Sequence, residues 1–276
     1  MKMLTRTLNN GSPPLGIRKQ KGRSALRARW QGLRTLAGVC VVATLLLTRC
    51  AGTDIGNPEL KSADVQVSFA SYEQNTPSGL VLDSGVTLNE AWIGVEAIRL
   101  ADAGDCASDA TIDLPDHYVI NLLTGQSYPP LPSFKRLEGA YCSFAFGFAV
   151  VSDLPAEAPA LLAGNSFLVR GLRIDGVPFL LTAPLEEVLS LAAESGQFEL
   201  RAPRTDLIVG FELDLWFASG LLDTVLGLLD LNLDLLSNPS LVTEFLNGVR
   251  GSVSLFEDLD HDGLLDPEEM TPLARP

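Results

Sequence analysis

Strict alternation of apolar and polar or small residues is the most regular pattern in this chain. Throughout Cys142–Val150 every second residue is apolar and the residues between are small, and Val65–Phe69 alternates in the same way with polar neighbours. Successive side chains of a strand point to opposite faces of a sheet, so both segments are predicted to be strands with one face in a core. Cys142 falls on the predicted core face, which favours a disulfide inside the core.

Several further segments have the texture of short strands. Two apolar runs are joined by Asp175-Gly176, a strong signal for a hairpin. A second strand pair is expected to turn through Ser195-Gly196, and an irregularity is expected at Asn89-Glu90. The predicted strands lie in Val86–Leu100, Tyr118–Leu123, Phe167–Ile174, Val177–Thr182, Val188–Leu191 paired with Phe198–Leu200, and Val209–Phe217.

The texture changes after Gly220. Leu221–Leu236 fits both a helical and a strand period, and we expect a helical turn followed by a short strand. Asn238 can cap a helix over residues 239–249, and a last short strand starts at Val253. These elements predict an all-β fold for residues 63–276, an antiparallel β-sandwich with one short C-terminal helix.

The first 49 residues resemble a bacterial lipoprotein signal. They hold ten basic residues and no acidic one, with an apolar stretch of 14 residues at Thr35–Thr48. That stretch is shorter than the roughly 20 residues that span a bilayer, so it predicts an export signal. The resemblance implies that Cys50 is lipidated and becomes the mature N-terminus, although Arg49 stands where a small residue is usual. The alternative is an export signal that is uncleaved or cleaved elsewhere.

This leader implies a location. Residues 50–62 are polar and are expected to form a tether between the lipid and the domain. Ala51 after the lipidated cysteine favours the bacterial outer membrane or the cell surface, with a periplasm-facing orientation as a further possibility. The predicted contact with the membrane is through the lipid anchor.

Charge separates sharply between the leader and the rest. The whole chain has 20 basic and 34 acidic residues; because the leader carries ten of the bases, residues 50–276 hold ten against 34, a net charge of −24. A surface this negative repels nucleic acid and favours cation binding. Nucleic-acid binding is therefore excluded from the expected functions.

Cysteine usage agrees with export. Besides Cys40 in the apolar stretch and Cys50, the chain has only Cys106 and Cys142. Two remaining cysteines in an oxidising compartment usually pair, so we expect a structural disulfide between them. A redox-active pair is the alternative, but the spacing is unlike Cys-x-x-Cys.

The segment 258–269 matches the calcium-loop template. A strand-like segment precedes it, and because Met270–Pro276 contains Pro272 we expect no exit helix, a pattern typical of isolated calcium sites on exported β-domains. A calcium ion that stabilises the fold is expected; a switch, a partner-bridging ion or a solvated acidic tail are the alternatives. The expected Ca²⁺ ligands are Asp258, Asp260, Asp262, the Leu264 carbonyl, Asp266 and Glu269, with Gly263 at the sharp turn and Leu265 as apolar anchor.

Three segments between Val86 and Val150 resemble a family of bacterial lipoprotein domains of unknown function. They are Trp92–Ile98, Val119–Leu123 and Leu137–Tyr141, the last departing at Glu138, where alanine is usual. The resemblance implies an immunoglobulin- or transthyretin-like sandwich on an exported protein. It implies no catalytic residues.

Candidate catalytic chemistry is sparse. The two histidines, His117 and His261, provide no zinc site, and no Gly-x-Ser-x-Gly motif occurs. We therefore expect a non-enzymatic structural, adhesive or assembly role with an envelope protein or glycan as partner. The alternative is a carbohydrate-binding or carbohydrate-active surface formed by Glu212, Asp214 and Trp216 on the outward face of the Val209–Phe217 strand.

Overall fold

The computed structural model describes residues 61–72, 79–104, 106, 111–217, 222, 230–232 and 239–276, with only the backbone of 230–232. These residues belong to one compact unit, Glu59–Pro276. The predicted export signal, Cys50 and most of the predicted tether lie outside them, as does most of Leu221–Leu236. Within them no helix combines the length and apolar character that crossing a bilayer requires.

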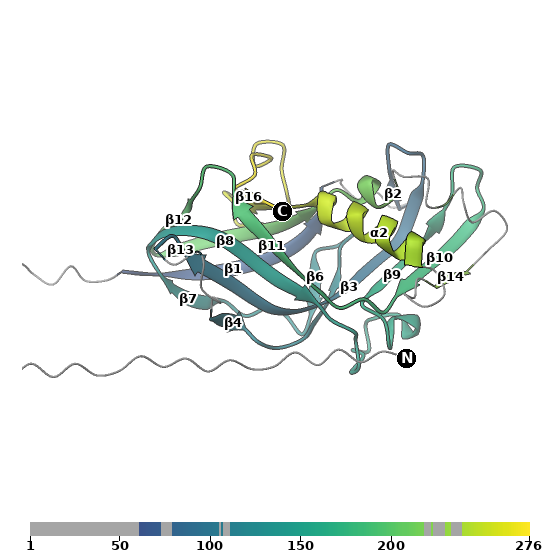
Figure 1. Cartoon of the computed structure of the whole chain (residues 1–276), viewed down its shortest axis with the longest axis horizontal. Helices are drawn as coiled ribbons and strands as arrows, with labels where there is room; N and C mark the ends of the chain where they lie inside the picture. The colour runs from purple at the N-terminus through teal and green to yellow at the C-terminus, as the bar shows by residue number, and fades with distance from the viewer. Residues whose placement is uncertain are drawn as a thin grey trace, which may run out of the picture. The chain divides into compact units, whose positions relative to one another are not determined.

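The described part of the chain is mostly β-strand (Figure 1), which confirms the all-β prediction. The first eight strands are β1 Ser62–Ser71, β2 Leu80–Val81, β3 Thr87–Asp102, β4 Ile112–Leu114, β5 Tyr118–Asn121, β6 Gln126–Tyr128, β7 Phe134–Leu137 and β8 Gly139–Phe148. The others are β9 Phe167–Leu172, β10 Pro178–Ala183, β11 Glu187–Ala193, β12 Phe198–Leu200, β13 Arg204–Phe211, β14 Asp230–Asn232, β15 Val253–Glu257 and β16 Ala274–Arg275. The helices are α2 Pro239–Ser252 and the 3-10 helices η1 Ala160–Leu162 and η2 Leu213–Trp216.

These strands form one hydrogen-bonded sheet. Its order is β14-β10-β9-β3-β8-β11-β16-β15-β13-β1-β7, with β2, β4 and β5 also on β3, β6 on β5, and β12 on β8. The two-residue strand β16 is the link between β11 and β15 in this order. Most pairs are antiparallel, whereas β1 runs parallel to β13 and β10 parallel to β14.

The sheet curls so that its two halves share one core. Four strands lie between β1 and β8 in the sheet order, yet the ring centroids of Phe69 on β1 and Phe146 on β8 are 5.4 Å apart. Phe211 on β13 also contacts Phe146, at 6.3 Å. These rings are fully buried and belong to the same large apolar cluster, so burial of the inner face across the curl holds the two halves together.

Helix α2 packs on the inner face beside η2. Phe245 is fully buried, and its ring lies 5.3 Å from Phe167 and 5.6 Å from Trp216. The predicted helix over 239–249 is confirmed and extends to Ser252. The strand predicted from Val253 is confirmed as β15.

The alternating segments are strands, as predicted. In β1 every second residue from Ala63 to Phe69 is buried, and Phe144, Phe146 and Phe148 of β8 are fully buried. The hairpin is confirmed as β9 and β10, and the irregularity near Asn89 is a register shift between Leu88 and Glu90.

One predicted strand pair is wrong. Both β11 and β12 exist, but each pairs with β8 instead of with the other. Partners of β11 run from Phe148 to Ser143 and those of β12 from Tyr141 to Gly139, so the two strands follow one another along one edge of β8. The Ser195-Gly196 turn therefore interrupts a strand and does not reverse it.

The Cys106–Cys142 disulfide is confirmed, with a Cα–Cα distance of 6.0 Å. Cys142 is buried as expected, at 8% exposed, but the bridge as a whole does not lie inside the core. The register of β3 against β8 shifts between Ala101 and Asp102, so that Tyr141 joins the main core cluster and Cys142 does not. Cys106 is exposed. A bulge of this kind reverses the alternation of faces, which the sequence period alone does not reveal.

Candidate metal centre

The loop that connects β15 to β16 carries the candidate metal site. Leu255 of β15 pairs directly with Ala274 of β16, so both ends of the loop are fixed in the sheet. In Figure 1 this segment is the yellow loop that stands out from the sheet before the C-terminus.

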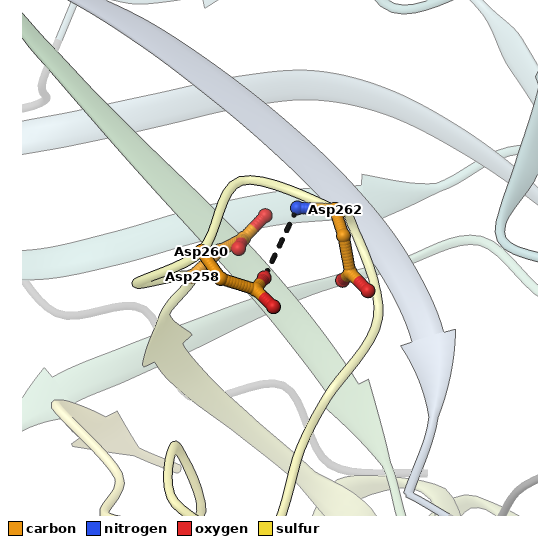
Figure 2. Close-up of side chains that lie close together, drawn as sticks. All are labelled: Asp258, Asp260 and Asp262. Atoms are coloured by element: carbon orange, nitrogen blue, oxygen red, sulfur yellow. Dashed lines mark hydrogen bonds between the residues drawn. The ribbon is translucent and has the colours of Figure 1, made fainter.

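Three aspartates converge within this loop (Figure 2). Asp258, Asp260 and Asp262 each offer a carboxylate oxygen, and these oxygens all lie within 4.8 Å of one another. The backbone folds tightly around them: the amide of Asp262 donates to Asp260 Oδ1 at 3.2 Å, and the amide of Leu264 donates to Asp262 Oδ1 at 2.7 Å. Gly263 has a φ of +77°, a conformation that glycine adopts without the cost of a side chain.

Two buried carboxylates close the base of the loop. Asp258 is 4% exposed and accepts hydrogen bonds from the amides of His261 at 2.6 Å and Gly263 at 3.0 Å. Glu269 is 5% exposed and accepts from the amides of Leu259 at 2.6 Å and Asp266 at 3.2 Å. The first and twelfth positions of the predicted loop therefore hold its backbone through amide hydrogen bonds, which satisfy both buried carboxylates.

An apolar contact fixes the loop to the sheet. Leu265 is 5% exposed and packs in a small cluster with Ala70, Ile208 and Phe256. The expected anchoring role of Leu265 is confirmed. Leu264, whose carbonyl was the expected ligand, has a side chain that is 54% exposed.

Sequence reasoning missed a polar contact between the loop and β13. Asp206 of β13 is 3% exposed; its carboxylate accepts from Arg204 Nε at 2.7 Å and lies 2.9 Å from His261 Nδ1. The carbonyl of Asp206 accepts the amide of Asp258 at 3.0 Å. His261 thus connects the loop to the sheet. No local pattern signals this contact, because Asp206 and His261 are 55 residues apart in the sequence.

The electrostatics of the loop oppose full ionisation. Burial raises the pKa of Asp258, and the nearby charges of Glu269 and Asp206 add to the effect, while the amides of Gly263 and His261 act against it. The pKa of Asp266 is raised by desolvation and then by Asp262, Asp260 and the two glutamates that follow. A bound cation would relieve this repulsion.

The donor set fits a hard divalent cation. Two oxygens that share a Ca²⁺ ion at about 2.4 Å can be at most about 4.8 Å apart. The three aspartate oxygens meet this limit, whereas Asp266 and Glu269 are not in that group. Glu269 is nevertheless tied to the same turn through Leu259.

The predicted carbohydrate site at Glu212, Asp214 and Trp216 does not form an outward face of a strand. The predicted strand Val209–Phe217 is wrong beyond Phe211, where β13 ends and η2 begins. Trp216 is fully buried, and its Nε1 donates to Ser252 Oγ at 2.8 Å. Asp214 instead accepts the amide of Ser84 at 3.0 Å. Glu212, Asp214 and Trp216 therefore form no carbohydrate platform, because a turn of 3-10 helix replaces the expected alternation.

Comparisons with known proteins identify no family for this chain. No protein-family model and no curated protein matches the chain. A solved structure, MbnP from Methylosinus trichosporium, is similar over 57% of this chain and 78% of that chain, with 14% sequence identity and a TM-score of 0.30. A similarity this remote carries no argument about family or activity.

Proposed function

We propose that this chain is a lipid-anchored β-sandwich of the bacterial envelope, in which a Ca²⁺ ion at 258–269 stabilises the C-terminal part of the fold. Its role is structural, adhesive or in assembly, without enzymatic activity, and its partner is an envelope protein or a glycan. The observation that carries the proposal is the convergence of the Asp258, Asp260 and Asp262 carboxylates on a loop fixed at both ends.

The position of the loop gives the ion a structural task. Strand β16 follows the loop and lies between β11 and β15, where the two halves of the proposed sandwich meet. It contributes only two residues, so its place depends on the loop that precedes it. Calcium would neutralise the aspartates, favour the closed loop and so hold β16 between its neighbours.

The anchor and the location rest on the leader. The ten basic residues and the apolar stretch support export, and Cys50 supports lipidation at the outer membrane or the cell surface. The net charge of −24 outside the leader favours cation binding and disfavours contact with nucleic acid. The resemblance to envelope lipoprotein domains supports the same assignment.

Thermal unfolding of the full chain tests the calcium proposal. Extracellular modules bind Ca²⁺ with Kd values of about 10⁻⁴–10⁻³ M, so about 10 mM Ca²⁺ should stabilise the fold by about 1–3 kcal/mol relative to EDTA. In Glu269→Gln most of this increase in Tm should disappear. The matched control Glu268→Gln changes an exposed neighbour and should keep it.

Magnesium distinguishes a site from general screening. Mg²⁺ at the same concentration should raise Tm much less, because it demands a tighter octahedral shell. Equal shifts with both ions, or an equal Ca²⁺ shift in Glu269→Gln and Glu268→Gln, would refute a calcium site in this loop.

A further inference from the structure

A cavity of about 520 Å³ lies on a part of the domain that the proposed calcium site does not use. Its walls come from β3 at Gly94, from the start of β5, from the end of β6 at Tyr128 and from the segment 149–155 that follows β8. Four separate stretches of chain thus meet around it.

One wall of the cavity requires close backbone packing. The amide of Ala149 donates to the carbonyl of Gly94 at 3.0 Å, and a Cβ at Gly94 would collide with the carbonyl oxygen of Ala149. Val151 next to this crossing is buried against Trp92 in a small apolar cluster. Only glycine allows the segment to cross β3 so closely, and the crossing shapes one wall.

Aromatic rings provide another part of the wall. The ring of Tyr128 lies 6.1 Å from Trp92, and its hydroxyl donates to Gln126 Oε1 at 2.8 Å. Tyr118, which also lines the cavity, is 2% exposed and packs in the main core cluster, so Tyr128 is the more accessible of the two rings. Tyrosine faces attract organic cations.

The charges around the cavity have one sign. Asp116 and Asp153 line it and are exposed, and none of the described residues that line it is lysine or arginine. His117 at the rim is 71% exposed, with Nδ1 at 3.3 Å from Glu96 Oε2. The pKa of Tyr118 is raised by burial and then by the charge of Asp116, so this carboxylate acts on the cavity wall.

We propose that this cavity binds an organic cation, an alkylammonium or guanidinium group with an apolar stem. The stem would pack against Tyr128 and the apolar wall, and the charged head would lie at Asp116 and Asp153. The inference does not depend on calcium binding. The same chemistry is offered by a free amine and by a lysine or arginine side chain of a partner protein.

Calorimetric titration of the full chain with n-butylammonium tests the proposal. Saturable binding is expected, and n-butanol, which has the same stem and no charge, should bind at least about tenfold more weakly. The double variant Asp116→Asn/Asp153→Asn should weaken n-butylammonium binding by a similar factor. The control Asp83→Asn/Glu186→Gln removes two exposed charges that do not line the cavity and should bind as the parent chain does.

A second titration separates the two sources of the cation. N-acetyl-lysine N-methylamide binds if the cavity accepts a side chain carried on a peptide; its exclusion alongside n-butylammonium binding indicates a free amine. Absence of saturable n-butylammonium binding, equal binding of n-butanol, or equal losses in the two double variants would overturn the proposal.

Discussion

The loop 258–269 and the segment 209–217 have the same sequence signature and opposite structures. In each, polar or acidic residues recur at intervals of two: Asp258, Asp260 and Asp262 in the first, Glu212 and Asp214 in the second. In the loop the carboxylates converge within 4.8 Å. In the other segment, residues beyond Phe211 turn into η2 and the chain returns to the core.

The difference shows that spacing alone does not place side chains on one face. Residues two apart on an extended strand lie about 7 Å apart, too far for several of them to share one ion. The loop brings its aspartates closer because Gly263, at φ +77°, permits a tight turn. In the 209–217 segment the chain turns as the 3-10 helix η2 instead, and this turn buries the large apolar surface of Trp216.

The largest expected effect concerns the 209–217 segment, whose tryptophan is buried. Trp216→Ala should lower the free energy of unfolding by about 3–5 kcal/mol, because it leaves a cavity beside Phe167, Phe211 and Phe245. Chemical denaturation of the full chain measures the loss. Ser252→Ala, which removes the hydroxyl that accepts from Trp216 and donates to the Val249 carbonyl, should cost about 1–2 kcal/mol. A loss below about 1 kcal/mol for Trp216→Ala would indicate that this tryptophan is exposed to solvent.

A pair of neighbouring leucines tests how the loop is attached. Leu265→Ala should destabilise the fold by about 2–4 kcal/mol, because this side chain packs on Ile208 and Phe256. Leu264→Ala removes the same atoms from an exposed position and should stay within about 0.5 kcal/mol of the parent. Denaturation midpoints of the two variants should therefore differ clearly; similar midpoints would mean that the loop is not packed on the sheet.

Acid should weaken the effect of calcium. The folded-state pKa of Asp258 is raised above its ordinary value of 3.8, so without metal this group favours folding when protonated and loses that contribution as the pH rises through the raised pKa. Calcium requires the ionised form, so the Ca²⁺-dependent rise in Tm should be largest at about pH 7. At about pH 3.5, below the ordinary value of 3.8, protonation of Asp258 competes with calcium because its pKa is raised above that value, and most of the rise should be lost.

The pH series needs its own reference. Tm is measured with and without Ca²⁺ at each pH, so that general acid destabilisation cancels in the difference. Glu269→Gln should show a small Ca²⁺ effect at both values. A Ca²⁺-dependent rise that is as large at the acidic value as at the neutral one would contradict a carboxylate site that includes Asp258.

The smallest expected effect tests the turn itself. Gly263→Ala should cost about 1 kcal/mol, since the position has positive φ and no neighbouring atom lies within 4 Å of an added Cβ, so only backbone strain opposes it. Gly251→Ala is the matched control in α2, where space is equally free and alanine should stabilise by up to about 1 kcal/mol. Denaturation curves should shift in opposite directions; a stabilising Gly263→Ala would refute the left-handed turn.

Much of the fold was predictable where one local signal dominated. The alternation in β1 and β8, the Asp-Gly hairpin between β9 and β10 and the amphipathic helix α2 are all present. The predictions failed where one extra residue or one turn changes which side chains of a strand face the core. The bulge at Cys142 places Tyr141 in the core. The interruption at Ser195-Gly196 places β11 and β12 one after the other along the same edge of β8.

The candidate metal site was predictable in its chemistry but not in its attachments. The template placed the acids, Gly263 and the anchor Leu265, since all of these act within a few residues of one another. The contacts of His261 and Asp258 with Asp206 join positions about fifty residues apart, and no local pattern encodes them.

By itself the sequence determined the β-rich composition of the domain, the oxygen-rich loop and the pairing of its last two cysteines. These follow from side-chain periodicity, the ligand preferences of hard cations and a simple count of residues. Only the tertiary structure decided that Trp216 is buried, that β16 joins β11 to β15, and that four separate segments enclose an acidic, aromatic cavity. Those features depend on which segments, distant in the sequence, cover the same apolar surface. Close packing across the curled sheet determines which of them do.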